Sequence, residues 1–180
     1  MPRRSVLLGL GALGGCAGGG AWPLPDYLFS LTVWAAGEKI DLLLLNTTEH
    51  PLRLVDILPR GLSVRVRDET RTVLTQGPDG YAPVFEPLDP ARLDAKKARS
   101  VRAWKAAKAS VGTRILAQRL APALAQPLDP ARAYDLEFMV EAPVVDPAGA
   151  VRIARVKSRS LCETRFDPAA MRTDCRSALS

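Results

Sequence analysis

The side chains that could perform acid–base or nucleophilic chemistry are few in this 180-residue sequence. His50 is the single histidine, so a hydrolytic triad would have to use it as its base. It lies between Glu49 and Pro51 in a polar stretch that is typical of a surface loop. No serine occupies a G-x-S-x-G turn. The sequence therefore offers no pair of nucleophile and base.

Two pairs of carboxylates have a spacing that could support glycoside hydrolysis, Asp68 with Glu69 and Asp135 with Glu137. The first pair falls at a strand end or turn, and the second falls on the polar face of an alternating strand, so both are explained without catalysis. The sequence contains no phosphate-binding glycine loop and no cluster with metal-ligand spacing. We therefore expect a protein that is not an enzyme and that uses no cofactor or metal.

The N-terminus has the features of an export signal. Arg3 and Arg4 precede an uncharged run from Val6 to Leu13. This run is far shorter than the roughly twenty residues that a bilayer-spanning helix needs. It ends in Leu13-Gly14-Gly15-Cys16, which resembles the lipobox of bacterial lipoproteins. The resemblance implies that Cys16 is lipidated and becomes the new N-terminus; an ordinary cleaved signal is the alternative.

The same resemblance predicts where the protein resides. Residues 1–15 are expected to be the signal peptide, and residues 16–26 the lipidated cysteine and a flexible glycine-rich tether. The stretch Arg3-Arg4-Ser5-Val6-Leu7-Leu8 is similar to a twin-arginine export motif, with Sec export as the alternative. Ala17, rather than aspartate, follows the cysteine and resembles outer-membrane sorting. These features imply a lipid-anchored protein of the cell envelope, at the outer membrane and facing the periplasm.

Two cysteines remain in the mature chain, Cys162 and Cys175. In an exported protein such a pair is most simply a disulfide that closes a small loop. Closing a loop of this size stabilises a fold by about 3 kcal/mol. A metal site would need further ligands, and a redox pair is more often spaced as C-x-x-C. We therefore predict a structural disulfide.

Positive charge is concentrated in one segment of the chain. Between Arg92 and Arg119 there are nine Lys or Arg residues and one acid, a local charge of +8. Charge this uneven produces a directed electrostatic field. A solvated face that only maintains solubility is one interpretation; the other is an interaction surface for anionic headgroups or an acidic envelope partner. That surface would consist of Lys96, Lys97, Arg99, Arg102, Lys105 and Lys108.

The whole mature chain is only mildly basic, because about four positive charges remain once the signal peptide is removed. Nucleic acid is therefore not expected as a partner.

Most of the remaining sequence has the period of half-buried strands. Phe29, Leu31 and Val33 alternate with Ser30, Thr32 and Trp34. The run from Ile40 to Leu45 is apolar on both faces at its far end, as in a central strand. Asp146-Pro147-Ala148-Gly149 predicts a hairpin turn. Further strands are expected at 52–57, 62–66, 70–74, 134–140 and 151–161, the last with a bulge near Arg155.

A helical insert is predicted between the two blocks of strands. Asp89-Pro90 is a typical helix start, and residues 91–109 are rich in alanine, lysine and arginine. A second short helix is expected from Thr113 to about Leu120. Residues 27–180 are thus predicted to form a single antiparallel β-sandwich, of the immunoglobulin or transthyretin-like kind, with a helical insert at about 89–121.

The corner at residues 45–52 is similar to the strand B to strand C corner of bacterial immunoglobulin-like domains, a likeness that carries no activity. We expect a lipid-anchored envelope protein that acts in binding or scaffolding, as a component of an envelope or secretion assembly. The alternative is a ligand-binding or inhibitor-like module whose contacts come from loop 46–51 or loop 75–85.

Overall fold

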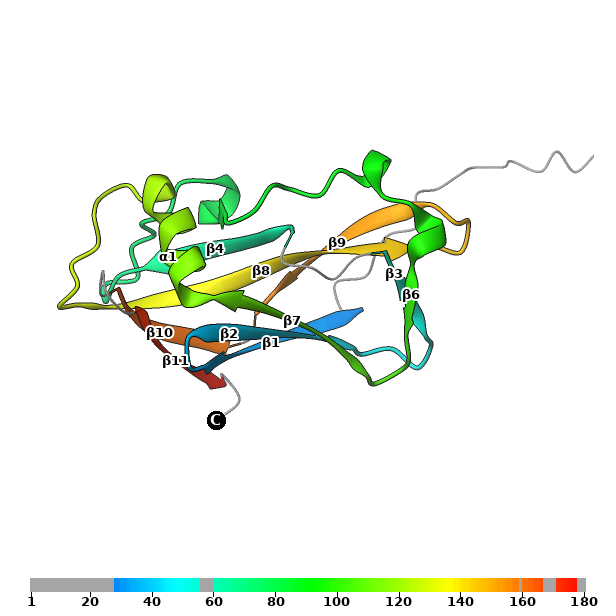
Figure 1. Cartoon of the computed structure of the whole chain (residues 1–180), viewed down its shortest axis with the longest axis horizontal. Coiled ribbons are helices and arrows are strands. Elements are labelled where there is room, and N and C mark those ends of the chain that lie inside the picture. The colour runs from blue at the N-terminus through cyan, green and yellow to red at the C-terminus, as the bar shows by residue number, and fades with distance from the viewer. Residues whose placement is uncertain (1–27, 56–59, 159, 167–170, 178–180) are drawn as a thin grey trace, which may run out of the picture.

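The computed structural model describes residues 28–55, 60–158, 160–166 and 171–177, and they form a mainly β protein. Two antiparallel sheets are stacked, with one short α-helix at one end of the molecule (Figure 1). The predicted fold class, an antiparallel β-sandwich with a helical element, is confirmed. The predicted signal peptide, the lipidated Cys16 and the tether lie outside the described residues.

The smaller sheet has three strands in the order β1-β2-β7. They are β1 (Phe29–Ala36), β2 (Lys39–Asn46) and β7 (Ala106–Gly112). β1 and β2 form a tight hairpin, which turns at Gly37 with a positive φ of 63°. β2 is the central strand, as its apolar run predicts.

The larger sheet is organised around β8 (Ala133–Val145). One edge of β8 pairs with β4 and β3, and the other edge pairs with β9 and β10. Its other strands are β3 (Leu52–Leu54), β4 (Leu62–Arg67), β5 (Ala82–Pro83), β6 (Arg99–Val101), β9 (Val151–Lys157), β10 (Ser160–Phe166) and β11 (Met171–Ser177).

The hydrophobic core lies between the two sheets. Strand alternation places one side chain in two on the inner face. The inner faces contribute Leu31 and Val33 from β1, Val64 from β4 and Phe138 from β8, all of which are almost fully buried. The outer face of the larger sheet is therefore left to polar and charged residues.

Helix α1 (Thr113–Leu120) covers one end of the sandwich and packs against β7 and β11. Thr113, Leu116 and Leu120 are buried, and their spacing places them on one helical face. The 3-10 turn η4 (Ala121–Ala123) follows, and its Pro122 has no backbone N–H to continue the α-helix. The predicted short helix is confirmed.

The long helix predicted over residues 91–109 is wrong. The segment contains the single 3-10 turns η2 (Pro90–Arg92) and η3 (Ala95–Lys97), then strands β6 and β7. Asp89 does cap a turn, because its side chain accepts a hydrogen bond from the backbone N–H of Ala91, but only one turn follows. Backbone pairing of seven residues of β7 with β2 outweighs the helix preference of alanine and lysine, which is worth less than about 1 kcal/mol per residue.

Residues 70–74 form no regular strand, contrary to prediction, and only isolated bridges occur at Val73 and Thr75. The side chain of Asp68 accepts hydrogen bonds from the Thr70 hydroxyl and from the Thr72 backbone N–H, both at 2.7 Å. This side-chain turn replaces strand pairing. Of the strand predicted at 52–57, residues 52–54 form β3. Residues 56 and 57 lie outside the described part of the chain.

The predicted hairpin after β8 is confirmed. Gly149 has a φ of 85°, its N–H bonds to the carbonyl of Asp146, and the Asp146 carboxylate accepts a hydrogen bond from the Ala150 N–H at 2.8 Å. β9 then returns along β8 in continuous register.

The predicted bulge occurs in the returning strand, but not near Arg155. Met139 pairs with Lys157, whereas Leu136 pairs with Cys162, so the returning strand gains two residues between these pairs. Ser158 occupies this position: its N–H bonds to the Phe138 carbonyl at 2.7 Å, and its hydroxyl accepts the Phe138 N–H at 3.1 Å. The side chain thus satisfies a backbone donor that the interrupted ladder would otherwise leave without its strand partner.

Replacing Ser158 with alanine should therefore destabilise the domain. The Phe138 N–H would lose its acceptor, and leaving a buried donor unsatisfied costs about 1–3 kcal/mol. Urea denaturation would measure the change. Ser63→Ala, on the outer face of β4, is the matched control and should change stability by less than about 0.5 kcal/mol. Equal stability of the two variants would contradict this role of the Ser158 hydroxyl.

Candidate functional site

Asn46, the last residue of β2, holds together the end of the molecule opposite to α1 (Figure 1). Its side chain is fully buried, and its amide donates to the carbonyls of His50 at 2.8 Å, Val101 at 3.0 Å and Arg102 at 3.3 Å. Its carbonyl oxygen accepts hydrogen bonds from the N–H and the hydroxyl of Thr48. One side chain therefore joins the β2–β3 corner to the connection between β6 and β7.

The connection between β6 and β7 is the Trp104 turn, residues 102–105. The Lys105 N–H bonds to the Arg102 carbonyl, and the Trp104 N–H bonds to the backbone carbonyl of Asn46 at 3.1 Å. Trp104 has a φ of 58°, in a turn position that favours glycine, and its side chain is 61% exposed. A large aromatic ring is thus held in solvent on a strained backbone.

The first described residue, Leu28, lies at the same end. Its carbonyl accepts a hydrogen bond from the N–H of Thr47, the residue after Asn46. The chain that precedes β1 therefore joins the domain beside the corner on which the Trp104 turn is built.

The structure brings most of the predicted basic surface to this end of the molecule. Five of its residues follow one another from η3 through β6 to the Trp104 turn, and all five are exposed. They are Lys96, Lys97, Arg99, Arg102 and Lys105. These residues lie on turns and a short strand. The prediction that they lie on one face of a helix is therefore wrong.

Lys108 does not join this group. It lies in β7 on the outer face of the smaller sheet, where its ammonium forms an ion pair with Asp41 at 2.7 Å. Asp41 also accepts hydrogen bonds from Ser110 at 2.6 Å and from the Trp34 indole at 3.1 Å. These contacts, led by the one from Lys108, hold the pKa of Asp41 below its usual value. The charge of Lys108 is therefore largely neutralised within the domain.

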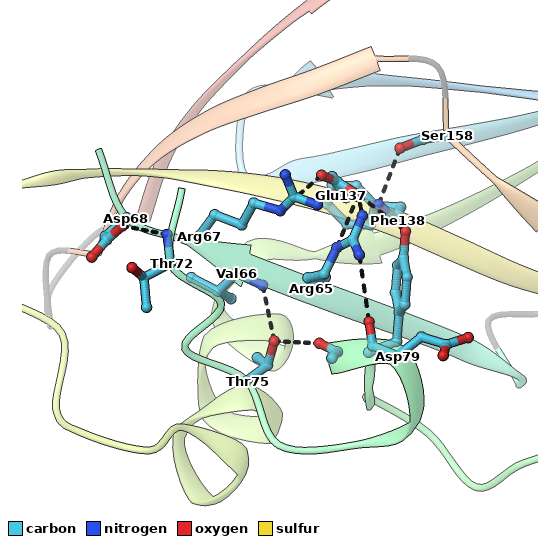
Figure 2. Close-up of polar contacts among 12 residues, drawn as sticks. Arg65, Val66, Arg67, Asp68, Thr72, Thr75, Asp79, Glu137, Phe138 and Ser158 are labelled. Atoms are coloured by element: carbon cyan, nitrogen blue, oxygen red, sulfur yellow. Dashed lines mark hydrogen bonds and ion pairs between the residues drawn. The ribbon is translucent and has the colours of Figure 1, made fainter. Parts of the chain in front are cut away.

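A second polar cluster lies on the outer face of the larger sheet, around Glu137 of β8 (Figure 2). Arg65 of β4 donates to its carboxylate from Nε at 3.0 Å and also from Nη2, and Arg67 Nε lies 3.2 Å from the other oxygen. The Tyr81 hydroxyl donates to the same carboxylate at 3.1 Å. Glu137 is therefore engaged by three side chains from two other segments.

Tyr81 lies almost fully buried beneath two cations. The Arg65 guanidinium carbon is 4.7 Å from the centroid of its ring and Lys157 Nζ is 5.4 Å from it. Burial, and next the negative charge of Glu137, raise the pKa of Tyr81 to about 12.

This shift predicts a pH dependence. Because the folded state holds the phenol proton more tightly than the unfolded chain, the stabilising effect is present below the ordinary pKa of 10.0 and is lost as pH rises through about 12. Glu137→Gln should lower the pKa of Tyr81, as followed by ultraviolet absorbance of phenolate. Glu163→Gln, in β10, is the control and should leave it unchanged. A Tyr81 pKa that is the same in the Glu137→Gln variant would contradict the coupling.

Next to this cluster the surface is hollowed. The hollow has a volume of about 590 Å³ and includes Tyr81, Met139 and Val156 as apolar lining. Asp79 and Lys157 also line it, and neither has an ion-pair partner within the described residues. This volume is in the range of small-molecule sites. Of the two loops predicted to carry ligand contacts, 75–85 contributes to the hollow.

The two C-terminal cysteines are brought opposite each other. β10 and β11 are antiparallel neighbours, and Cys162 pairs with Cys175 in their register. Directly opposed residues of an antiparallel pair have Cα atoms about 4.5–5.5 Å apart, within the range that a disulfide spans. Cys162 is fully buried.

His50 is exposed in the loop after β2, as predicted, and its carbonyl accepts the hydrogen bond from the Asn46 amide. Within the described ranges no three His, Cys, Asp or Glu residues are placed to hold a metal ion. None of the helices in that part of the chain has the length and apolar character needed to cross a membrane.

Sequence reasoning missed Asn46, Glu137 and Tyr81. The sequence indicates Glu137 only as a residue of a polar strand face, because no local pattern shows that β4 pairs with β8 and sets Arg65 opposite it. Asn46 was interpreted as part of a polar connection. Its position directly after the apolar run 42–45 is the available signal.

These features define an antiparallel β-sandwich with a basic, tryptophan-bearing end and a polar outer face. No known protein family matches the chain, and no curated relative matches it. Among solved structures, the chain is similar to a protein from Archaeoglobus fulgidus, with 8% identity over 77% of this chain and 95% of that one, and with a TM-score of 0.30. A similarity at this level carries no argument about function.

Proposed function

We propose that this protein is a lipid-anchored component of the bacterial cell envelope that acts in binding or scaffolding and is not an enzyme. The observation that carries the proposal is the placement of Leu28 beside the Trp104 turn. The chain between Cys16 and the domain therefore leaves from the end that carries the exposed basic residues. A domain tethered to a bilayer in this way turns that end towards the membrane.

A binding role suits the chemistry of the outer face better than catalysis does. The Glu137 carboxylate forms hydrogen bonds and ion pairs with Arg65, Arg67 and Tyr81, more contacts than any other acid of the cluster makes. A general acid or base needs a proton that it can exchange with a substrate. We expect outer-membrane attachment facing the periplasm, because Ala17 follows the cysteine.

We further propose a structural disulfide between Cys162 and Cys175, supported by their opposed register in β10 and β11. An oxidising envelope compartment would favour it. It would fasten the last strand to the larger sheet. Mass spectrometry of a non-reduced digest should find the two cysteine peptides linked, and separate peptides with free thiols would contradict the pairing.

The anchor is tested by expressing the full chain in bacteria with an alkyne-bearing fatty acid. Label at Cys16, a mature chain beginning there, and recovery in the membrane fraction are expected. Cys16→Ser should lose all three, whereas Ser5→Ala should keep them. An unmodified thiol at Cys16, or a mature chain that begins elsewhere, would overturn the proposal of a lipid anchor.

The scaffolding role is tested by cross-linking in intact cells followed by purification in mild detergent. Recovery with a larger envelope complex is expected. Recovery of the protein with itself alone would count against scaffolding and would favour the ligand-binding alternative.

The hollow beside Tyr81 is the observation that favours this second function, a ligand-binding module. Its apolar lining with Asp79 and Lys157 suits a small molecule with an apolar body and charged groups. A thermal-shift screen of amino acids and small organic acids should find ligands whose effect Met139→Trp abolishes by filling the hollow. A ligand effect that survives this substitution would remove the hollow as the site.

A further inference from the structure

We propose that the Trp104 turn is a docking site for the headgroup region of an anionic phospholipid bilayer, with the indole inserted among the headgroups and the flanking basic residues paired with lipid phosphates. The proposal rests on the envelope location proposed above. It goes beyond that location because it assigns a second, non-covalent membrane contact to named residues of the folded domain.

The backbone of the turn indicates that Trp104 is displayed for a contact outside the domain. A non-glycine residue with a positive φ is strained, and such strain persists only where the surrounding structure holds it. Here the hydrogen bond from the Trp104 N–H to Asn46 holds it, and Asn46 is itself fixed by buried hydrogen bonds. The domain gains little from the ring, since 61% of it remains exposed.

The indole ring suits a bilayer interface. Tryptophan combines a large apolar surface with one N–H donor, and it is enriched at the level of lipid headgroups. Trp34, the other exposed tryptophan of the described residues, differs in this respect, because its N–H is committed to Asp41. The Trp104 side chain is exposed, so its indole N–H can donate a hydrogen bond to water or to a lipid headgroup.

The charges around the turn select an anionic surface. Lys105 follows Trp104 directly and Arg102 precedes it by two residues. The other exposed basic residues of this end are Lys96, Lys97 and Arg99. None of the five has an ion-pair partner within the described residues. Each basic residue near an anionic membrane surface strengthens binding by roughly fivefold.

Two acidic residues lie in the neighbouring segments and reduce this field without cancelling it. Asp94 is committed to capping η3 through the Lys96 N–H, and Glu49 is exposed in the loop after β2. The end as a whole stays positive.

The tether is long enough for the turn to reach the bilayer. Leu28 follows Cys16 by twelve positions in the sequence, with eleven residues between them. Even when fully extended, a chain of this length spans at most about 40 Å. Because Leu28 joins the domain beside the turn, the turn stays within this distance of a lipid-bound Cys16.

The test uses the mature chain, residues 16–180 with Cys16→Ser, so that neither acylation nor the basic, apolar signal peptide contributes. The vesicles are of pure phosphatidylcholine or of phosphatidylcholine with phosphatidylglycerol. Sedimentation should show binding to the anionic vesicles alone, with a blue shift of tryptophan emission. Arg102→Ala with Lys105→Ala should weaken this binding by about tenfold or more, because two surface charges are removed. The control is Arg114→Ala with Arg165→Ala, exposed basic residues of α1 and β10, which should bind as the parent does.

A second variant separates docking from folding. Trp104→Gly removes the ring and also relieves the strained backbone, so it should weaken vesicle binding while leaving the urea midpoint unchanged or higher. Equal binding to neutral and anionic vesicles, or an equal loss in the Arg114 and Arg165 control, would overturn the docking site. Cross-linking of the turn to an acidic protein without vesicle binding would overturn it as well.

The two proposals fail separately. Lipid found on Cys16 together with no vesicle binding of the Cys16→Ser chain would overturn the docking site and leave the anchor in place. Vesicle binding together with an unmodified Cys16 thiol would overturn the anchor and support the docking site.

Discussion

Asn46→Ala should lower the free energy of unfolding by about 3 kcal/mol, the largest effect expected for a polar residue of this domain. Its two amide N–H groups serve three carbonyls, those of His50, Val101 and Arg102, and its side chain is fully buried. Each buried group that is left unsatisfied costs about 1–3 kcal/mol, and water can reach only some of them in the variant. Urea denaturation measures the loss.

The same substitution should also loosen the Trp104 turn, because Asn46 positions that turn through side chain and backbone alike. Faster hydrogen exchange at residues 102–105, with α1 unchanged, is the expected pattern. Asn46→Asp should be no better than alanine, since it keeps the contacts to Thr48 but turns a negative charge towards carbonyl oxygens. Gln118→Ala, an exposed residue of α1, is the control and should cost less than about 0.5 kcal/mol. An Asn46→Ala variant as stable as this control would refute the structural role of the amide.

Glu137→Ala should destabilise the domain by about 2–3 kcal/mol. The substitution leaves Arg65 and Arg67 without their shared carboxylate and the Tyr81 hydroxyl without its acceptor. Removing one partner of a fully buried ion pair costs about 3–5 kcal/mol. The side chains of Arg65 and Glu137 keep 18% and 15% exposure, so water screens part of this loss.

A double-mutant cycle with Arg65→Ala isolates the pair. Arg65→Ala together with Glu137→Ala should cost less than the sum of the two single changes, because the second substitution removes a group that the first left unpaired. Asp135→Ala, on the same face of β8, is the control and should be close to neutral. Strict additivity of the two substitutions in thermal or urea unfolding would show that the contact between Arg65 and Glu137 does not stabilise the fold.

Alternation identified the strands whose two faces differ most in polarity. β1, β4 and β8 were predicted from period-two patterns, and the hairpin at Asp146 to Gly149 from its turn residues. These signals are local, because one buried face and one solvated face impose the pattern on each strand separately. The prediction of α1 also uses local signals, because Gly112 precedes this helix and Pro122 follows it.

The segment at 91–109 shows where local signals failed. Alanine, lysine and arginine favour a helix weakly, yet Ala107, Ala109 and Val111 face the core of the sandwich from β7 while Lys108 and Ser110 face outward. Small side chains carry little strand propensity, so the alternation of β7 was hidden. The partner strand β2 decided the outcome through backbone pairing, which no pattern within the segment records.

The sequence by itself determined the class of the domain, the positions of its most regular strands and the concentration of positive charge in one segment, because these follow from composition and from periods of a few residues. The tertiary structure decided which residues meet. It set Arg65 opposite Glu137, Cys162 opposite Cys175, and Asn46 beneath the Trp104 turn, through pairings between segments up to 72 residues apart. Such pairings depend on the register of strands and on the burial of whole sheets, and these arise only when the complete chain folds.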